Sequence, residues 1–333
     1  MKTIVIAEAG VNHNGDLKKA KKLIKIAAKA KADYVKFQFY KTENLVTKNS
    51  ITANYQKKNF KKEISQYKLL KKYELNEKKI QELINVSKKY KIKFLSSVFD
   101  EESLEKLFSL KIFDIKIPSG ELNNYPLIER IAKKAKKIFI STGMATINEI
   151  AGALKILKKN KKIKKNLFLM HCHTDYPTKI KDVNLRVMPF LHKKFKVRIG
   201  YSDHSLNNSV GIAAVSLGAE VIEKHFTISK KLLGPDHKAS LEPKELVEFI
   251  NCVRDTELLL GSSIKKLSKN EKSIKKIVRK SIVAKTIIKK GQIFSNQNII
   301  CKRPEGGMPP KLWNSVLGKK AKKNFIKDQR ITL

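Results

Sequence analysis

Six of the seven histidines of this 333-residue chain fall at or just after segments that are typical of short buried strands. The six are His13, His171, His173, His204, His225 and His237. His204 and His225 follow two successive strand segments, so neighbouring strands would bring both side chains within reach of one metal ion. Imidazole binds several divalent transition metals, and two protein ligands leave coordination positions open for a substrate. The spacing is equally consistent with two rim histidines that only make hydrogen bonds.

Two lysines, Lys36 and Lys116, lie inside predicted strands. A lysine in a short buried strand is costly unless it faces an anion or a carboxylate. Together with Ser119, Gly120 and the turn at 141–143, the two lysines could bind a phosphate group through hydroxyls and backbone N–H groups. The alternative is that Lys36 extends to solvent.

Carboxylates follow the same strands, and they are Glu8, Glu121, Asp175, Asp203, Glu223 and Asp236. One acidic residue at a strand end is often only the partner of a buried lysine. Six such residues beside lysines and histidines favour a site for a polar, hydroxylated substrate. The pattern therefore predicts a metal-assisted enzyme that acts on a phosphate-bearing or polyhydroxy small molecule.

The elements that must position these residues are eight short apolar segments, each followed by a helical pattern. The segments are 3–7, 34–37, 93–96, 112–117, 138–141, 167–170, 197–200 and 221–223. Alternating strands and helices with chemistry at the strand ends predict an α/β fold of the (β/α)8 TIM-barrel type.

The predicted domains are a barrel over residues 1–261, a linker over 262–279 and a small β-rich domain over 280–333. So small a tail is expected to dock on a barrel, its own or a partner's. The long gap at 41–76 contains Tyr55, Phe60 and Tyr67, and it is either a substrate lid or a surface excursion.

The amino-acid composition bears on nucleic-acid binding and on the cellular compartment. The net charge of +42 suggests nucleic acid, but the excess is lysine spread along the whole chain and only seven residues are arginine. No specific nucleic-acid binding is expected. Cys172, Cys252 and Cys301 form no CxxC pair, which fits a reducing cytoplasm. No signal peptide or membrane span is expected.

Read in order, the strand-end motifs resemble one family. They are IAEAGVNHNGD (6–16), VKFQ (35–38), SVFD (97–100), KIPSGEL (116–122), STGMAT (141–146), HCHTDYP (171–177), GYSDHS (200–205), EKHFT (223–227) and GPDHKASLEP (234–243). The series closely resembles the sialic acid synthases, which include N-acetylneuraminate, legionaminate and pseudaminate synthases. The tail motifs KKGQIF (289–294) and CKRPEGG (301–307) resemble the antifreeze-like C-terminal (SAF, β-clip) domain of that family.

The resemblance implies condensation of phosphoenolpyruvate with an N-acetylated amino sugar and release of phosphate. N-acetylmannosamine, giving N-acetylneuraminate, is the expected substrate. The alternative is 2,4-diacetamido-2,4,6-trideoxymannose, giving legionaminic acid, and VNLR (183–186) with GPDHKASLEP resembles the branch shared by legionaminate-type and some N-acetylneuraminate synthases. A related aldolase acting on sugar phosphates would need basic residues for a second phosphate and would not need the tail.

The resemblance also assigns roles by motif. His204 and His225 are expected to hold a divalent metal, Mn²⁺ as the first choice with Mg²⁺ or Co²⁺ as alternatives. Phosphoenolpyruvate is expected on Lys36, Lys116, Ser119, Ser141 and Ser202. The sugar and metal region is expected to be lined by Glu8, Gln38, Glu121, Thr174, Tyr176 and Asp236, with Glu8, Glu121 and Asp236 as catalytic carboxyls. Arg303 is expected to reach the N-acetyl group in the partner's barrel, which implies a domain-swapped homodimer.

Overall fold

The computed structural model describes residues 2–51 and 65–333, so Tyr55 and Phe60 of the predicted lid lie outside the described residues. The chain divides into two compact units, Met1–Gly261 and Ser262–Leu333. The predicted linker 262–279 falls within the second unit.

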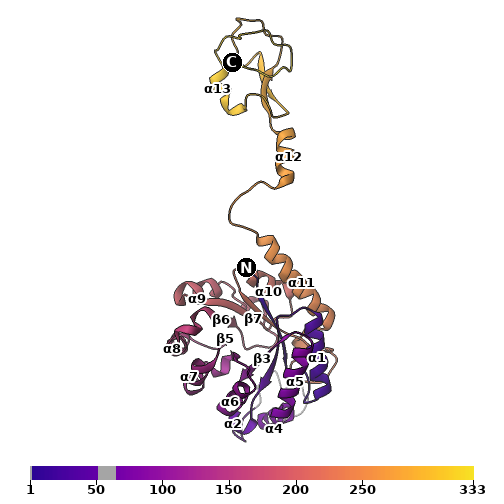
Figure 1. Cartoon of the computed structure of the whole chain (residues 1–333), viewed down its shortest axis with the longest axis vertical. Helices are drawn as coiled ribbons and strands as arrows, with labels where there is room; N and C mark the ends of the chain where they lie inside the picture. The colour runs from indigo at the N-terminus through magenta and orange to yellow at the C-terminus, as the bar shows by residue number, and fades with distance from the viewer. Residues whose placement is uncertain (1, 52–64) are drawn as a thin grey trace. The chain divides into compact units, whose positions relative to one another are not determined.

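The first unit is built on a closed barrel of eight parallel strands paired in chain order (Figure 1). The strands are β1 (Ile4–Gly10), β2 (Tyr34–Phe39), β3 (Lys93–Val98), β4 (Asp114–Ile117), β5 (Lys137–Ser141), β6 (Leu167–Cys172), β7 (Arg198–Asp203) and β8 (Val221–His225). The predicted TIM barrel is confirmed. Most strands extend one to three residues beyond the predicted ends, so several polar residues belong to the strands themselves.

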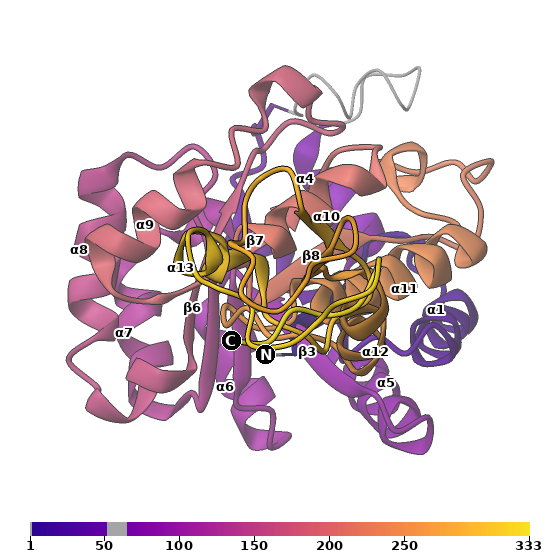
Figure 2. The ribbon, with the colours of Figure 1, turned by 90° about the horizontal axis from the view of Figure 1, so that it is seen from above.

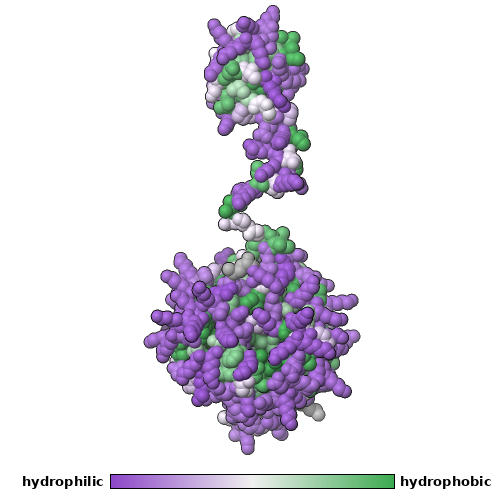
Figure 3. Space-filling model, in the orientation of Figure 1, coloured by the Kyte–Doolittle hydropathy of each residue, from purple (hydrophilic) through white to green (hydrophobic). Residues whose placement is uncertain are grey.

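Helices surround the barrel in both ribbon views (Figure 1, Figure 2). They are α1 (Leu17–Lys29), α2 (Thr42–Leu45), α4 (Gln66–Tyr73), α5 (Glu77–Lys89), α6 (Glu101–Ser109), α7 (Tyr125–Lys134), α8 (Ile147–Leu157), α9 (Val187–Phe195), α10 (Asn208–Ser216) and α11 (Pro243–Leu260). In α1, Asp16 caps the first turn and Ala20, Leu23, Ile24 and Ala27 are buried. The lysines of such helices face outward, which produces the hydrophilic surface visible in Figure 3.

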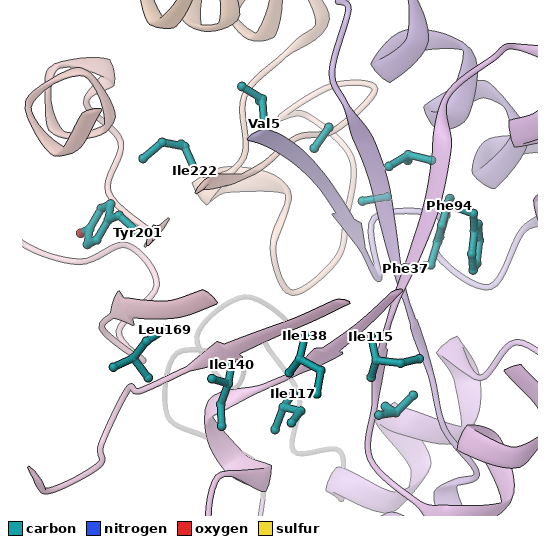
Figure 4. Packing of buried hydrophobic residues seen from close by; sticks show 14 of the residues in the cluster. Val5, Phe37, Phe94, Ile115, Ile117, Ile138, Ile140, Leu169, Tyr201 and Ile222 are labelled. Carbon is teal, nitrogen blue, oxygen red and sulfur yellow. The ribbon is translucent and has the colours of Figure 1, made fainter. Parts of the chain in front are cut away.

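The barrel strands carry two apolar layers, because successive side chains of a strand point to opposite faces. Outward residues pack against the helices, as Figure 4 shows for Val5, Phe37, Ile115, Leu169 and Ile222. Inward residues form a separate cluster of Ile6, Tyr34, Leu95, Phe139, Phe168, Met170 and Val221. Two residues further along several strands, the inward positions become polar. This inward apolar cluster therefore forms the floor of a polar site at the carboxyl ends of the strands.

The second unit has its own core of Ile282, Ala284, Ile288, Phe294, Ile299, Val316, Ala321, Phe325 and Ile331. It contains α12 (Lys269–Val278), the antiparallel strands β9 (Ser281–Ala284) and β10 (Ile299–Lys302), and the short α13 (Trp313–Val316). The apolar pattern of residues 293–300 predicts a strand, but this prediction is wrong in its bounds because β10 begins only at Ile299. Asn298 folds the preceding segment into a turn, accepting from Ser295 N–H at 2.8 Å and donating to the Ile293 carbonyl at 2.8 Å.

Within the described residues, no helix combines the length and apolar character needed to span a membrane.

Candidate active site

A cavity of about 220 Å³ opens at the carboxyl ends of the barrel strands, a size suited to a small metabolite. Sequence-predicted residues that line it are Glu8, Lys36, Gln38, Lys116, Ser119, Ser141, Thr174, Tyr176, Ser202, His204, His225 and Asp236. They come from the β1, β2, β4, β5, β6, β7 and β8 strands or the loops after them. Barrel closure thus gathers positions that span more than two hundred residues of sequence.

Two lysines and two glutamates form the centre of the cavity. Lys36 Nζ lies 2.9 Å from Glu8 Oε2 and 3.6 Å from Glu223 Oε1, and it donates to Ser97 Oγ at 2.8 Å. Lys116 Nζ lies 3.0 Å from Glu223 Oε2. All four charged side chains are at most 5% exposed, so Lys36 does not extend to solvent. Glu223 therefore holds both lysines at the cavity.

The ionisation of this centre is uneven. Burial opposes the charged form of Glu223, but attraction to Lys116 and Lys36 outweighs it and lowers the pKa to about 2. Burial raises the pKa of Glu8 because Lys36 offsets it only in part. Burial also lowers the pKa of Lys116, although Glu223 counteracts the shift. An anionic ligand beside Lys116 would favour its charged form.

Hydroxyl groups and one crowded glycine form another wall of the cavity. Ser119 Oγ accepts from the Gly143 N–H at 3.0 Å and lies 3.2 Å from Cys172 Sγ. A Cβ on Gly143 would meet Thr174 Cγ2 at 2.8 Å and Ser119 Oγ at 2.9 Å, so the close packing requires glycine here. This wall supplies donors suited to a phosphate or carboxylate.

The two predicted metal ligands do come together. The ring centroids of His204 and His225 are 5.4 Å apart, and Tyr176 lies 4.2 Å from the His204 ring. His204 Nδ1 donates to the carbonyl of His173, which leaves the lone pair on Nε2, and Nε2 lies 3.2 Å from the Oγ of Ser202. Burial lowers the pKa of His204 to about 4, and burial together with His204 lowers that of His225 well below its usual range. Both imidazoles are therefore neutral at pH 7, as metal ligation requires.

These residues fit a divalent metal. His225 Nδ1 is buried without a hydrogen-bond partner among the described residues. A Cβ on Gly10 would lie 3.2 Å from Glu8 Oε1, 3.6 Å from His225 Cε1 and 3.7 Å from Asp236 Oδ2, so this glycine lets two carboxyls and an imidazole converge. Within the part of the chain that the structure describes, no three or more His, Cys, Asp or Glu side chains are grouped as a ready metal cluster. The donor set is thus two imidazoles with open positions.

Asp236 is a carboxyl able to exchange a proton near neutrality. It is 7% exposed, and burial, with a further contribution from Glu8, raises its pKa to about 7. A group whose pKa lies near the working pH is an efficient general acid or base.

The predicted catalytic residue Glu121 is not part of the cavity lining. Glu121 is partly buried, accepts from Asn124 Nδ2 at 2.7 Å and has its pKa raised by burial. Arg303 belongs to the second unit. Asp203, a further strand-end carboxylate, faces away from the cavity and pairs with Lys224 at 2.7 Å.

Sequence reasoning missed the central position of Glu223, and it also missed Ser97 and the α4 residues Leu69, Leu70 and Tyr73 as cavity lining. The signal for Glu223 was present. It lies two positions before His225 on one strand, and the period of two places both side chains on the same face. The α4 residues reach the cavity only through tertiary packing of Leu69 and Tyr73 on Val11.

Comparison with known proteins places this geometry in a family. The sequence matches the NeuB family over residues 23–265 and the SAF domain over residues 279–333. It is 49% identical over 330 residues to the N,N'-diacetyllegionaminic acid synthase of Campylobacter jejuni, with 99% of each chain covered. It is 41% identical to the synthase of the same name from Legionella pneumophila, over 98% of this chain and 92% of that protein.

A solved structure supports the assignment. The N-acetylneuraminic acid synthetase of Leptospira borgpetersenii matches with a TM-score of 0.74 and 34% identity, over 82% of this chain and 90% of that chain. A polar barrel site, a family match over most of the chain and end-to-end relatives all agree. The chain is therefore an enzyme of the NeuB family that carries a C-terminal SAF domain.

Proposed function

We propose that this chain is an N,N'-diacetyllegionaminic acid synthase, which condenses phosphoenolpyruvate with 2,4-diacetamido-2,4,6-trideoxymannose and releases phosphate. The observation that carries the proposal is the 49% identity to a synthase of that name over 99% of both chains. The cavity adds chemical support, because it combines buried lysines for an anion with neutral imidazoles and carboxyls.

Phosphoenolpyruvate is assigned to the lysine and hydroxyl side of the cavity. Lys36 and Lys116 supply positive charge, and Ser119, Ser141 and Ser202 supply hydroxyls for the phosphate and carboxylate. The lowered pKa of Lys116 makes this lysine the most responsive to an incoming anion, since the ligand's charge restores its protonated form.

The amino sugar is assigned to the imidazole side, near Tyr176 and Gln38. C3 of phosphoenolpyruvate forms the new carbon–carbon bond with the aldehyde carbon of the open-chain sugar, and the aldehyde oxygen gains a proton. Water adds at C2 and loses its protons, and phosphate leaves with the electrons of its bond to C2. Asp236 and Glu8 are the carboxyls in the cavity that we assign to these proton transfers.

His204 and His225 would hold the divalent metal, for which Mn²⁺ is our first choice. When bound there, the metal would act as a Lewis acid on the sugar's carbonyl oxygen. The protein's own part is to keep both rings neutral by burial and to fix the His204 tautomer through the His173 carbonyl.

The test compares the two sugars in separate incubations. Purified protein is incubated with Mn²⁺, phosphoenolpyruvate and either 2,4-diacetamido-2,4,6-trideoxymannose or N-acetylmannosamine. Mass spectrometry of the nine-carbon acid identifies the product, and phosphate release gives kcat/KM for each sugar. A higher kcat/KM for the diacetamido sugar is expected. A clear preference for N-acetylmannosamine would overturn the assignment.

N-acetylneuraminate synthesis is the second candidate. It is favoured by the likeness to the Leptospira borgpetersenii synthetase at 34% identity. The same comparison separates the two functions, because the product masses differ.

A further inference from the structure

The carboxyl of Asp236 is carried by a loop, and that loop is attached to the end of β1 by side-chain hydrogen bonds. The loop, residues 233–240, follows β8 and contains one short helical turn, His237–Ala239. The β1 end contributes Asn12 and Asn14, which come from the segment NHNGD (12–16). No role in the proposed chemistry has been assigned to either asparagine.

Asn12 secures the second half of the loop. Its Nδ2 donates to Ser240 Oγ at 2.8 Å and to the Phe226 carbonyl at 2.8 Å. Ser240 Oγ in turn donates to the carbonyl of Asp236 at 2.7 Å. Asn12 is 0% and Ser240 1% exposed, so water does not compete for these bonds.

Asn14 secures the first half. Its Nδ2 donates to the Leu233 carbonyl at 2.9 Å, and its Oδ1 lies 3.2 Å from His237 Nε2. The other nitrogen of His237 lies 2.6 Å from Thr227 Oγ1. With Nε2–H donating to Asn14, Nδ1 accepts from the threonine hydroxyl, and burial lowers the pKa of His237 to about 4, which keeps the ring neutral.

The packing leaves little room for the loop to shift. A Cβ on Gly234 would lie 2.5 Å from His237 Cδ2 and 2.8 Å from Asn14 Oδ1. Asp236 Oδ2 would be 3.7 Å from a Cβ on Gly10, the residue that also borders Glu8 and His225. A small movement of the loop would therefore move the carboxyl relative to the imidazole.

We propose that Asn12, Asn14, Ser240 and His237 form a clasp that positions the Asp236 carboxyl for the condensation. The clasp acts on the loop backbone from both sides of Asp236. Its members are positioning residues, because they act through the loop. The inference rests on the proposed function, in which Asp236 takes part in proton transfer.

The test uses the full-length enzyme with Asn14→Gly and Ser240→Ala. Asn14 has a φ of 55°, so glycine removes the side chain without backbone strain. Each variant is expected to lower kcat by about 10- to 100-fold while the KM for phosphoenolpyruvate stays unchanged, because the misplaced Asp236 carboxyl is not an ion-pair partner of Lys36 or Lys116. The matched control is Asn184→Gly, an exposed asparagine with φ of 43°, and it should retain full kcat.

Two further measurements separate positioning from general destabilisation. In an Asp236→Asn background, Asn14→Gly should reduce kcat by less than about twofold, because residues that act as a unit are not additive. Full additivity, or a wild-type kcat in folded Asn14→Gly and Ser240→Ala, would overturn the clasp. Hydrogen exchange of amides 233–240 should also accelerate in both clasp variants but not in Asn184→Gly. That readout needs no turnover, so the clasp stays testable even when neither sugar is condensed.

Discussion

Two buried lysine–carboxylate clusters lie on opposite faces of the same barrel strand. Glu223 of β8 faces inward and pairs with Lys36 and Lys116. Lys224, the next residue, faces outward and donates to Asp203 Oδ2 at 2.7 Å and to the Ser205 carbonyl at 2.6 Å. Both clusters are almost fully buried, yet only the inner one borders the cavity.

The two clusters differ in how fully their charged groups are bonded within the protein. In the outer cluster, Asp203 also accepts from the N–H and hydroxyl of Ser205, so the acid and the base are both well bonded within the protein. Burial lowers the pKa of the lysine in both clusters, Lys224 and Lys116, but only the inner cluster borders the cavity, and there burial also raises the pKa of Glu8. Burial of a charged pair thus indicates function only where its charges stay responsive to a ligand.

The largest effect is expected at the imidazoles of the inner face. His225→Ala should reduce turnover by at least about 1,000-fold, since it removes one of two proposed metal ligands. Phosphate release measures the loss, and circular dichroism should show an unchanged fold. His192→Ala, on the outer helix α9, is the control. Substantial activity in folded His225→Ala would remove the metal assignment.

Glu223→Gln should lower kcat/KM for phosphoenolpyruvate by about 100-fold, because both lysines lose a charged partner. It should also change the pH profile. Glu223 raises the pKa of Lys116, so its removal lowers that pKa further and Lys116 loses its proton at lower pH. The alkaline limb of the kcat/KM profile should therefore move to lower pH.

The control for that change is Glu245→Gln, which breaks the half-exposed pair with Lys230 at 2.6 Å on the barrel surface. Its pH profile should match that of the wild type. An unchanged alkaline limb in Glu223→Gln would show that Glu223 does not set the charge of Lys116.

Substitution in the outer cluster is expected to lower the stability of the fold and to leave the activity of folded molecules nearly unchanged. Lys224→Met leaves Asp203 buried without its cation and should lower the free energy of unfolding by about 3–5 kcal/mol. Urea denaturation measures this change. The double variant Lys224→Met with Asp203→Asn should recover part of it, while kcat per folded molecule stays within about threefold. A large loss of kcat in Lys224→Met at wild-type stability would contradict the view that only the inner cluster serves catalysis.

The smallest effect is expected at Arg303, outside the barrel. Arg303→Ala should raise the KM for the amino sugar by about tenfold, as expected for loss of one charge-assisted hydrogen bond. In a domain-swapped dimer, subunit exchange between Arg303→Ala and His204→Ala proteins rebuilds intact sites in the hybrids. Such a mixture should recover about a quarter of the wild-type sites. No recovery after verified exchange would argue against a swapped tail.

Much of the fold could be predicted because parallel strands buried on both faces are nearly continuous apolar runs. The patterns of 101–109 and 243–260 predict helices with the bounds that α6 and α11 have, helped by Asp100 as N-cap and Gly261 as a stop. Strand ends were less predictable, because polar residues such as Glu8 and Gln38 continue the strands into the site. In the second unit, the apolar pattern of 293–300 predicts a strand, but the local turn of Asn298 overrides that pattern up to Asn298.

The sequence alone determined the family, the alternation of strands and helices, and the chemical types gathered at the strand ends. Those features are local or periodic, so they can be read from the order of residues. Only the tertiary structure decided that Glu223 bridges two lysines, that Lys224 and Asp203 face away, and that Asn12 and Asn14 hold the Asp236 loop. Each of these relations joins residues distant in sequence, and closing the barrel sets their distances and removes the water that would otherwise weaken them.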